Sequence, residues 1–262
     1  MITAGAGMGV DAGLPDFRSA NGFWRAYPAL AKSGVVFENI ASPQTFEDDP
    51  ELAWGFYGHR LNLYRSTQPH DGYRLLREWS SSLPHGAFVF TSNVDGWFQK
   101  AGFDANRVME CHGSIHHLQC MRSCADKLWA ADSVNPVVDN AMCRLVSPLP
   151  KCPDCGALAR PNILMFGDWN WLDTRTQMQR VRLQDWLMDA GSVVVIELGA
   201  GIHIPTVRQF GQQLGHPLIR INPTKPELGT ARGVSLRLGA LEALRGIDDA
   251  LRHHGEVGSK ST

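Results

Sequence analysis

A glycine-rich stretch near the start of the chain has the composition of a phosphate-binding loop. Four glycines lie within nine residues between Gly5 and Gly13. Glycine lets the backbone adopt positive φ and approach a ligand closely, and backbone N–H groups at the start of a helix can bind phosphate. The next five residues, Leu14–Arg18, add a proline, a carboxylate, an aromatic ring and a guanidinium. This combination predicts a dinucleotide site rather than a simple structural turn.

Two close pairs of cysteines predict a metal site. Cys120 and Cys124 form the first pair and Cys152 and Cys155 the second, with 27 residues between the two pairs. Four thiolates bind zinc tetrahedrally and leave no open coordination position, so this zinc would be structural. The alternative is four unrelated buried cysteines. Substitute ligands in the same segment are Cys143, His116 and His117.

Polar and glycine-containing turns follow three apolar runs that predict buried parallel strands. The runs cover 88–91, 193–196 and 218–221. Ligands collect at the carboxyl ends of parallel strands, so we expect the turns at 91–95, 199–201 and 222–223 to share one crevice with the glycine loop. Asn93 and Asp95 could bind a ribose hydroxyl and a carboxamide, or could simply close a turn.

His112 is the candidate general base. It follows a short predicted strand, Val108-Met109, and precedes the cysteine-containing segment. An imidazole titrates near neutral pH and is the usual proton acceptor in catalysis. A structural histidine is the alternative, but the place of His112 between the crevice and the metal segment favours a catalytic role.

The composition is that of a protein with a large core and no excess of positive charge, although local basic patches are compatible with it. The chain has 262 residues, 44% hydrophobic content and a formal net charge of −1, so no direct nucleic-acid binding is expected. No apolar run approaches membrane-spanning length, and no membrane partner is expected. Cysteines that bind a metal need a reducing compartment, so the expected location is cytoplasmic.

The chain is expected to form one catalytic unit, 1–262, in which two insertions interrupt a parallel-sheet domain. Residues 20–75 carry helical periodicity, and residues 115–162 hold most of the cysteines. We therefore expect a small lobe of two parts, one helical and one metal-binding. The segments expected in the sheet domain are 1–19, 76–114 and 163–254, and the polar tail 255–262 is expected to be disordered.

Taken together, these motifs resemble the sirtuins, the NAD-dependent protein deacylases, of bacterial type. The family pattern runs through the glycine loop, Pro-Asp-Phe-Arg, the Asn-x-Asp turn, His-Gly, two cysteine pairs, Phe-Gly-acid and Ile-Asn, in the order found here from about Thr3 to Leu251. The resemblance implies an α/β fold: a Rossmann-like parallel-sheet domain and a smaller lobe made of a zinc-binding module and a helical insertion. NAD and an acyl-lysine protein or peptide would bind between them, giving nicotinamide and O-acyl-ADP-ribose.

The resemblance also implies roles for particular residues. The catalytic residues would be His112 as the base, with Asn93 and Asp95. NAD would be bound by Gly5, Ala6, Gly7, Asp16, Phe17, Arg18, Ser92, Asn93, Asp95, Gly199, Ala200, Asn222 and Ala240, and the substrate would be contacted by Tyr57, Arg60, Phe166 and Gly167. The zinc ligands would be Cys120, Cys124, Cys152 and Cys155.

Several positions depart from the family pattern. Ser92 stands where the family has Gln, Tyr73 replaces a histidine, and Ala200-Gly201 replaces Thr-Ser. Each exchange changes a polar contact, worth about 0.5–1.5 kcal/mol for a hydrogen bond.

One match bears on the acyl group. Ala41, Tyr57 and Arg60 fit the arrangement of sirtuins that remove succinyl and malonyl groups. Arg60 could bind an acyl carboxylate through a charge-assisted bond that an acetyl group cannot make. The alternative is that Tyr57 lies in the lobe core and Arg60 on a solvated helix face.

Two other functions compete with deacylation. One is protein mono-ADP-ribosyl transfer, against which His112 argues. The other is a non-catalytic module that binds NAD or ADP-ribose and holds a partner through its zinc module. Nicotinamide release separates them, because both enzymes require it and the binding module does not.

Overall fold

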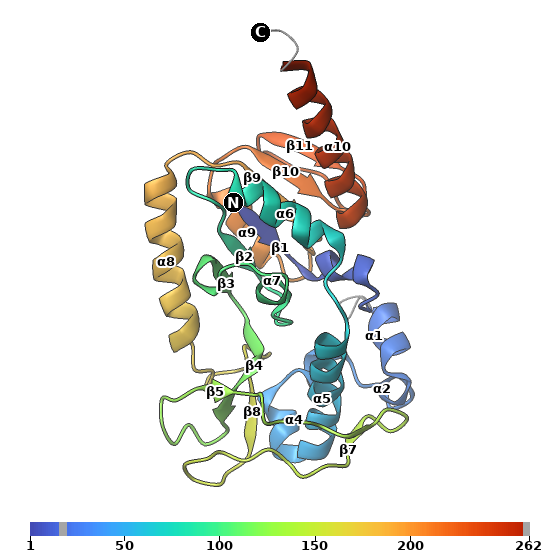
Figure 1. Cartoon of the computed structure of the whole chain (residues 1–262). Helices are drawn as coiled ribbons and strands as arrows, with labels where there is room; N and C mark the ends of the chain where they lie inside the picture. Colours follow the sequence, from blue (N-terminus) through green and yellow to red (C-terminus); the bar gives the residue numbers. More distant parts are fainter. Residues whose placement is uncertain (16–19, 259–262) are drawn as a thin grey trace.

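The computed structural model describes residues 1–15 and 20–258, with side chains left out at 20, 21, 23 and 254–258. The largest sheet of the described residues has six parallel strands (Figure 1). The strand order is β11-β10-β9-β1-β2-β3, the doubly wound topology in which ligands bind at the carboxyl edge. The strands are β1 (Ile2–Ala4), β2 (Val89–Thr91), β3 (Val108–Glu110), β9 (Val195–Leu198), β10 (Leu218–Ile221) and β11 (Gly233–Leu236).

Helices cover both faces of this sheet. One core cluster joins Ile2 and Val89 to Leu76 of α6 and Leu244 of α10. The second joins strand residues of the opposite face to α8 and α9. The elements around the sheet are η1 (Ala6–Ala12), α6 (Asp71–Ser81), α7 (Trp97–Lys100), η2 (Ala105–Arg107), α8 (Thr174–Ala190), α9 (Thr206–Gln213) and α10 (Ala240–Gly258).

A smaller lobe lies at the carboxyl edge of the sheet, in the lower half of Figure 1. Its helical part consists of α1 (Ala20–Ala26), α2 (Pro28–Lys32), α3 (Phe37–Ile40), α4 (Pro43–Asp48) and α5 (Pro50–Ser66). Its strand part consists of β4 (Gly113–Cys120) paired antiparallel with β8 (Ala159–Ile163) and β5 (Trp129–Ala130), together with the pair β6 (Val138–Asp139) and β7 (Arg144–Leu145).

Helix α5 is the central element of this lobe. Asp49 caps it by accepting a hydrogen bond from the Leu52 N–H at 3.1 Å. A Cβ at Gly55 would lie 2.1 Å from the Cys143 carbonyl oxygen, so only glycine allows the strand segment to approach this closely. The indole Nε1 of Trp54 donates to the Ala159 carbonyl at 2.9 Å. Helix α5 and strand β8 are therefore joined in the buried centre of the lobe.

Three expectations from the sequence need correction. The strand expected at 193–196 begins and ends two residues later, as Val195–Leu198. This strand includes Glu197, whose buried carboxylate is paired with Arg220 of β10 at 2.6 Å. Helix α10 continues to Gly258, so 255–258 of the expected disordered tail are helical. The expected boundary between 75 and 76 falls inside α6, which packs against α10.

Candidate active site and metal centre

A cavity of about 240 Å³ lies where the carboxyl edge of the sheet meets the small lobe. It brings together eight of the predicted site residues from segments far apart in the sequence. Those residues are Ala6, Tyr57, Arg60, Ser92, Asn93, Asp95, His112 and Phe166. Its other lining residues are Leu14, Pro15, Phe37, Ala41, Tyr64, Val94, Ile163, Leu164, Met165 and Ile204.

The turn after β2 supplies the polar wall of the cavity. The Asn93 side-chain amide donates to the Gly5 carbonyl at 3.0 Å, so this turn is tied to the glycine loop. Asp95 Oδ1 accepts from the Trp97 N–H at 2.9 Å and thereby starts α7. Burial raises the pKa of Asp95 to about 6, the Trp97 N–H opposes this shift, and the charge of Glu110 adds to it. The Asp95 carboxyl is therefore buried at the cavity wall and holds its proton more tightly than an ordinary carboxyl.

His112 lines the cavity where the chain passes from β3 into β4. Its carbonyl accepts from the Leu164 N–H at 3.0 Å. The next residue, Gly113, has φ +78°, and a Cβ there would lie 2.1 Å from the Asn162 carbonyl oxygen. Only glycine permits this close crossing, so the backbone on the C-terminal side of His112 has little freedom to shift.

Helix α5 supplies the opposite wall through Tyr57 and Arg60. The Arg60 guanidinium donates to the Tyr64 hydroxyl from Nε at 3.0 Å and from Nη2 at 2.7 Å. Its Cζ lies 5.3 Å from the centre of the Phe56 ring, a cation–π distance. Burial opposes the charge of Arg60, but the neighbouring tyrosine hydroxyls raise its pKa above the ordinary value. The guanidinium is therefore a permanent positive charge inside the cavity wall.

Tyr57 lies beside Arg60 in the same wall. Its ring stacks on Phe46 with centroids 5.6 Å apart, and burial raises the pKa of its hydroxyl well above the usual range. Tyr57 is buried and lines the cavity. It is therefore a neutral donor at the cavity surface.

The other predicted dinucleotide residues that the structure describes are not part of the cavity lining. Gly7 donates its N–H to the Gly199 carbonyl at 3.0 Å, and Asn222 donates its side-chain amide to the Ala200 carbonyl at 3.0 Å. These bonds join the glycine loop to the turns after β9 and β10. Gly5 and Ala240 also lie outside the lining, as does Gly167 of the predicted substrate residues, and Asp16, Phe17 and Arg18 fall outside the described residues.

The donor set along this edge fits a dinucleotide. Ser92, Asn93 and Asp95 line one cavity, and they carry a hydroxyl, an amide and a carboxyl. These groups match the hydroxyls and carboxamide of a nicotinamide riboside. The glycine loop beside them is the sheet's natural phosphate-binding position.

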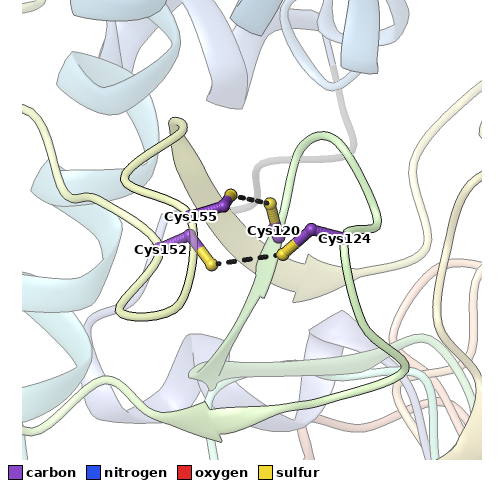
Figure 2. Close-up of side chains that lie close together, drawn as sticks. All are labelled: Cys120, Cys124, Cys152 and Cys155. Atoms are coloured by element: carbon purple, nitrogen blue, oxygen red, sulfur yellow. Dashed lines mark hydrogen bonds between the residues drawn. The ribbon is translucent and has the colours of Figure 1, made fainter.

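Four cysteine side chains converge in the small lobe, between the segment at the end of β4 and the segment that precedes β8 (Figure 2). The sulfur of Cys120 lies 3.6 Å from that of Cys155, and the sulfur of Cys124 lies 3.6 Å from that of Cys152. All four sulfurs lie within 4.8 Å of one another. A tetrahedral zinc with bonds of about 2.3 Å would place its sulfurs about 3.8 Å apart, so the cluster fits a structural zinc as predicted from the spacing.

Several lining residues were not identified as candidates from the sequence. Tyr64 could have been found, because it lies four residues after Arg60 on a predicted helix and such pairs face each other. Apolar residues such as Leu14 and Ile204 carry no comparable signal, since apolar side chains occur throughout the chain.

The described residues contain no helix long and apolar enough to cross a membrane.

Comparison with known proteins identifies the family. The model of the Sir2 family matches residues 5–197. "NAD-dependent protein deacylase 1" of Archaeoglobus fulgidus is 29% identical over 250 residues, which cover 95% of this chain and 90% of the relative. "NAD-dependent protein deacylase" of Thermococcus kodakarensis is 29% identical, with 97% and 93% covered. The crystal structure of a Sir2 homologue–NAD complex superposes with a TM-score of 0.71 at 27% identity, covering 98% of this chain and 89% of that one. The predicted Rossmann-like α/β fold is confirmed, and the chain belongs to the Sir2 family.

Proposed function

We propose that the chain is an NAD-dependent protein-lysine deacylase that releases nicotinamide and forms O-acyl-ADP-ribose. The observation that carries the proposal is the cavity in which His112, Asn93 and Asp95 face Tyr57 and Arg60. Membership of the Sir2 family and the names of the relatives support it. Its substrates would be acyl-lysine side chains of proteins or peptides.

The residues of the cavity divide the work between them. NAD, when bound, supplies an anomeric carbon from which nicotinamide can leave. Asn93 and Asp95 would orient the ribose and the carboxamide at the sheet wall. His112 would accept a proton from a ribose hydroxyl, and general-base assistance of this kind contributes about 10²–10⁴-fold to a rate. The cysteine cluster would hold zinc in a structural role and takes no part in a proton transfer.

We further propose that the α5 wall selects acidic acyl groups such as succinyl and malonyl. A carboxylate at the end of the acyl chain would accept from Arg60 and from the Tyr57 hydroxyl, since both residues line the cavity. Arg60 keeps its charge in a partly buried site, where a charge-assisted bond is worth about 1.5–3 kcal/mol. An acetyl group has no carboxylate and therefore gains no binding free energy from such a bond.

The test compares acetyl-lysine and succinyl-lysine peptides of the same sequence. Purified protein is incubated with NAD and each peptide, and nicotinamide and O-acyl-ADP-ribose are measured by mass spectrometry. We expect O-acyl-ADP-ribose from the unmodified protein and its loss in His112→Ala. We expect Arg60→Met to lower kcat/KM for the succinyl peptide about 10- to 100-fold more than for the acetyl peptide. Arg74→Met, which removes an exposed arginine of α6, is the matched control.

Each outcome has a distinct meaning. Equal losses on both peptides in Arg60→Met would contradict the acyl selectivity but not the deacylase. Nicotinamide release without O-acyl-ADP-ribose would indicate ADP-ribosyl transfer to protein. NAD left intact with both peptides would contradict any enzymatic function and would favour a binding module.

The proposal extends to organisation and location. The sheet domain would comprise 1–19, 71–114 and 163–254, because α6 packs against α10. Residues 20–70 and 115–162 would form the small lobe of a bacterial-type sirtuin. A four-thiol zinc site requires reduced cysteines, which supports a reducing compartment such as the cytoplasm.

A further inference from the structure

The outer edge of β3 is bonded to a helix. β3 is the last strand of the sheet, and its final residue, Glu110, faces α8. The Glu110 N–H donates to Gln179 Oε1 at 3.0 Å, and the Thr176 hydroxyl donates to the Glu110 carbonyl at 3.2 Å. Gln179 and Thr176 are each only 2% exposed. Two buried side chains of α8 thus supply the acceptor and the donor that a neighbouring strand would otherwise supply.

A third side chain of α8 binds the same residue. The guanidinium of Arg175 is ion-paired with the carboxylate of Glu110, which is 1% exposed. A carboxylate this deeply buried is stable only when it is paired. The N–H, the carbonyl and the side chain of Glu110 are therefore all bonded to one helix.

His112 lies two residues beyond this point, and two extended residues span at most about 7 Å. On its N-terminal side, the Cys111 N–H donates to the Thr91 carbonyl at 2.9 Å. On its C-terminal side, the His112 carbonyl is bonded to Leu164. The segment that carries the imidazole is thus hydrogen-bonded on both sides of His112. On its N-terminal side, the bonds from α8 to Glu110 fix the outer edge of β3.

We propose that Gln179, together with Thr176, is a positioning residue for His112 that acts through the backbone of Glu110. The inference rests on the proposed function, because it takes His112 as the base. Neither side chain lines the cavity, so neither would touch the substrate or NAD.

Proton transfer and nicotinamide release respond differently to a shift of His112. A general base must lie within hydrogen-bond reach of the proton that it accepts. Cleavage of the bond between the ribose carbon and nicotinamide, and its reversal when labelled nicotinamide is added, needs no proton transfer to His112. A displaced imidazole therefore slows O-acyl-ADP-ribose formation while nicotinamide exchange continues. A general loss of folded protein would lower both rates by the same factor.

The main variant is Gln179→Met, which keeps the length of the side chain and removes the acceptor. We expect O-acyl-ADP-ribose formation to fall about 10-fold or more relative to nicotinamide exchange, because a displacement near 1 Å can cost 10²-fold. In the protein without NAD, hydrogen–deuterium exchange of the Glu110 amide should become faster. The matched control is Gln177→Met, because Gln177 lies on the exposed side of α8 and bonds to Asp173. It should change neither quantity.

A second pair of variants covers the case in which Gln179→Met does not fold. Thr176→Val removes the hydroxyl and Thr176→Ser keeps it, so only Thr176→Val should separate the two rates. Parallel loss of both rates, or unchanged rates with faster amide exchange at Glu110, would overturn the positioning role. If the unmodified protein shows neither nicotinamide release nor exchange, the proposed function fails instead, and amide exchange still reports whether α8 holds β3.

Discussion

Replacing Asp95 with Asn should stabilise the protein while impairing its proposed activity. Burial raises the pKa of the Asp95 carboxyl from 3.8 to about 6. The folded protein therefore holds this proton more tightly than the unfolded chain does. The free energy of unfolding consequently falls as the pH rises from about 4 through 6, and the full penalty is present above that range. An asparagine in the same place carries no charge and avoids the penalty.

The size of the effect follows from the two pKa values. A difference of about two between the folded and the unfolded pKa corresponds to a loss of about 3 kcal/mol in the free energy of unfolding at pH 8, and roughly half of this loss remains at pH 5. The hydrogen bond that starts α7 is kept, because the side-chain oxygen of asparagine can still accept from the Trp97 N–H at the position where Asp95 Oδ1 accepts now. Asp95→Asn thus changes the charge and leaves the local geometry alone.

The assay is urea unfolding of both proteins at pH 5, 6, 7 and 8, with nicotinamide release measured on the same samples. We expect the variant to be more stable at pH 8, with an advantage that shrinks toward pH 5, and to release nicotinamide more slowly. Asp104→Asn is the matched control, because Asp104 makes the same kind of turn bond, to the Asn106 N–H at 2.9 Å, on the exposed surface. A variant no more stable than the unmodified protein at pH 8, or a pH-independent difference, would refute the reasoning.

Three further predictions concern stability. Arg160→Met should cost about 3–5 kcal/mol in urea unfolding, because it leaves the buried Asp168 carboxylate unpaired; Arg237→Met removes only exposed contacts, to Glu227 and to the Thr224 carbonyl, and should cost under about 1 kcal/mol. Metal analysis should find about one zinc ion per chain, and a strong chelator should lower the melting temperature; a metal-free protein with an unchanged melting temperature would contradict the zinc assignment. Gly199→Ala should destabilise the fold by more than Gly191→Ala, since both positions have positive φ but only the Cβ at Gly199 would meet neighbouring backbone, at 2.4 Å; equal melting temperatures would contradict this.

Strands that lie within a mainly apolar run could be predicted from the sequence, and strands that extend past such a run or lack one could not. Val89–Thr91 and Leu218–Ile221 form strands where predicted. β9 was predicted two residues early because Glu197 looks like the end of a strand. In the structure Glu197 lies opposite Arg220 in the strand register and pairs with it, and a partner 23 residues away cannot be identified from local pattern. The exposed edge strand Gly233–Leu236 was missed for a related reason, since edge strands need not be apolar.

The site shows the same division. Residue type and spacing were enough to predict the glycine loop, the Asn93–Asp95 turn, His112 and the cysteine pairs as candidates. The raised pKa of Asp95 does not, because it depends on burial that only the fold creates. The hydrogen bonds from α8 to Glu110 could not be predicted from the sequence either, because Gln and Thr on a helix usually face solvent.

The two walls of the cavity come from different parts of the chain, so one wall can change in sequence while the other stays the same. The groups proposed to bind the dinucleotide and move the proton follow sheet strands, whereas the groups proposed to meet the acyl chain lie on α5 and after β8. Substitutions at Tyr57 or Arg60 change the second wall and leave every strand of the sheet intact. One reaction centre can therefore be combined with many acyl pockets, so a library restricted to α5 should yield altered acyl preferences with the nicotinamide-releasing step preserved.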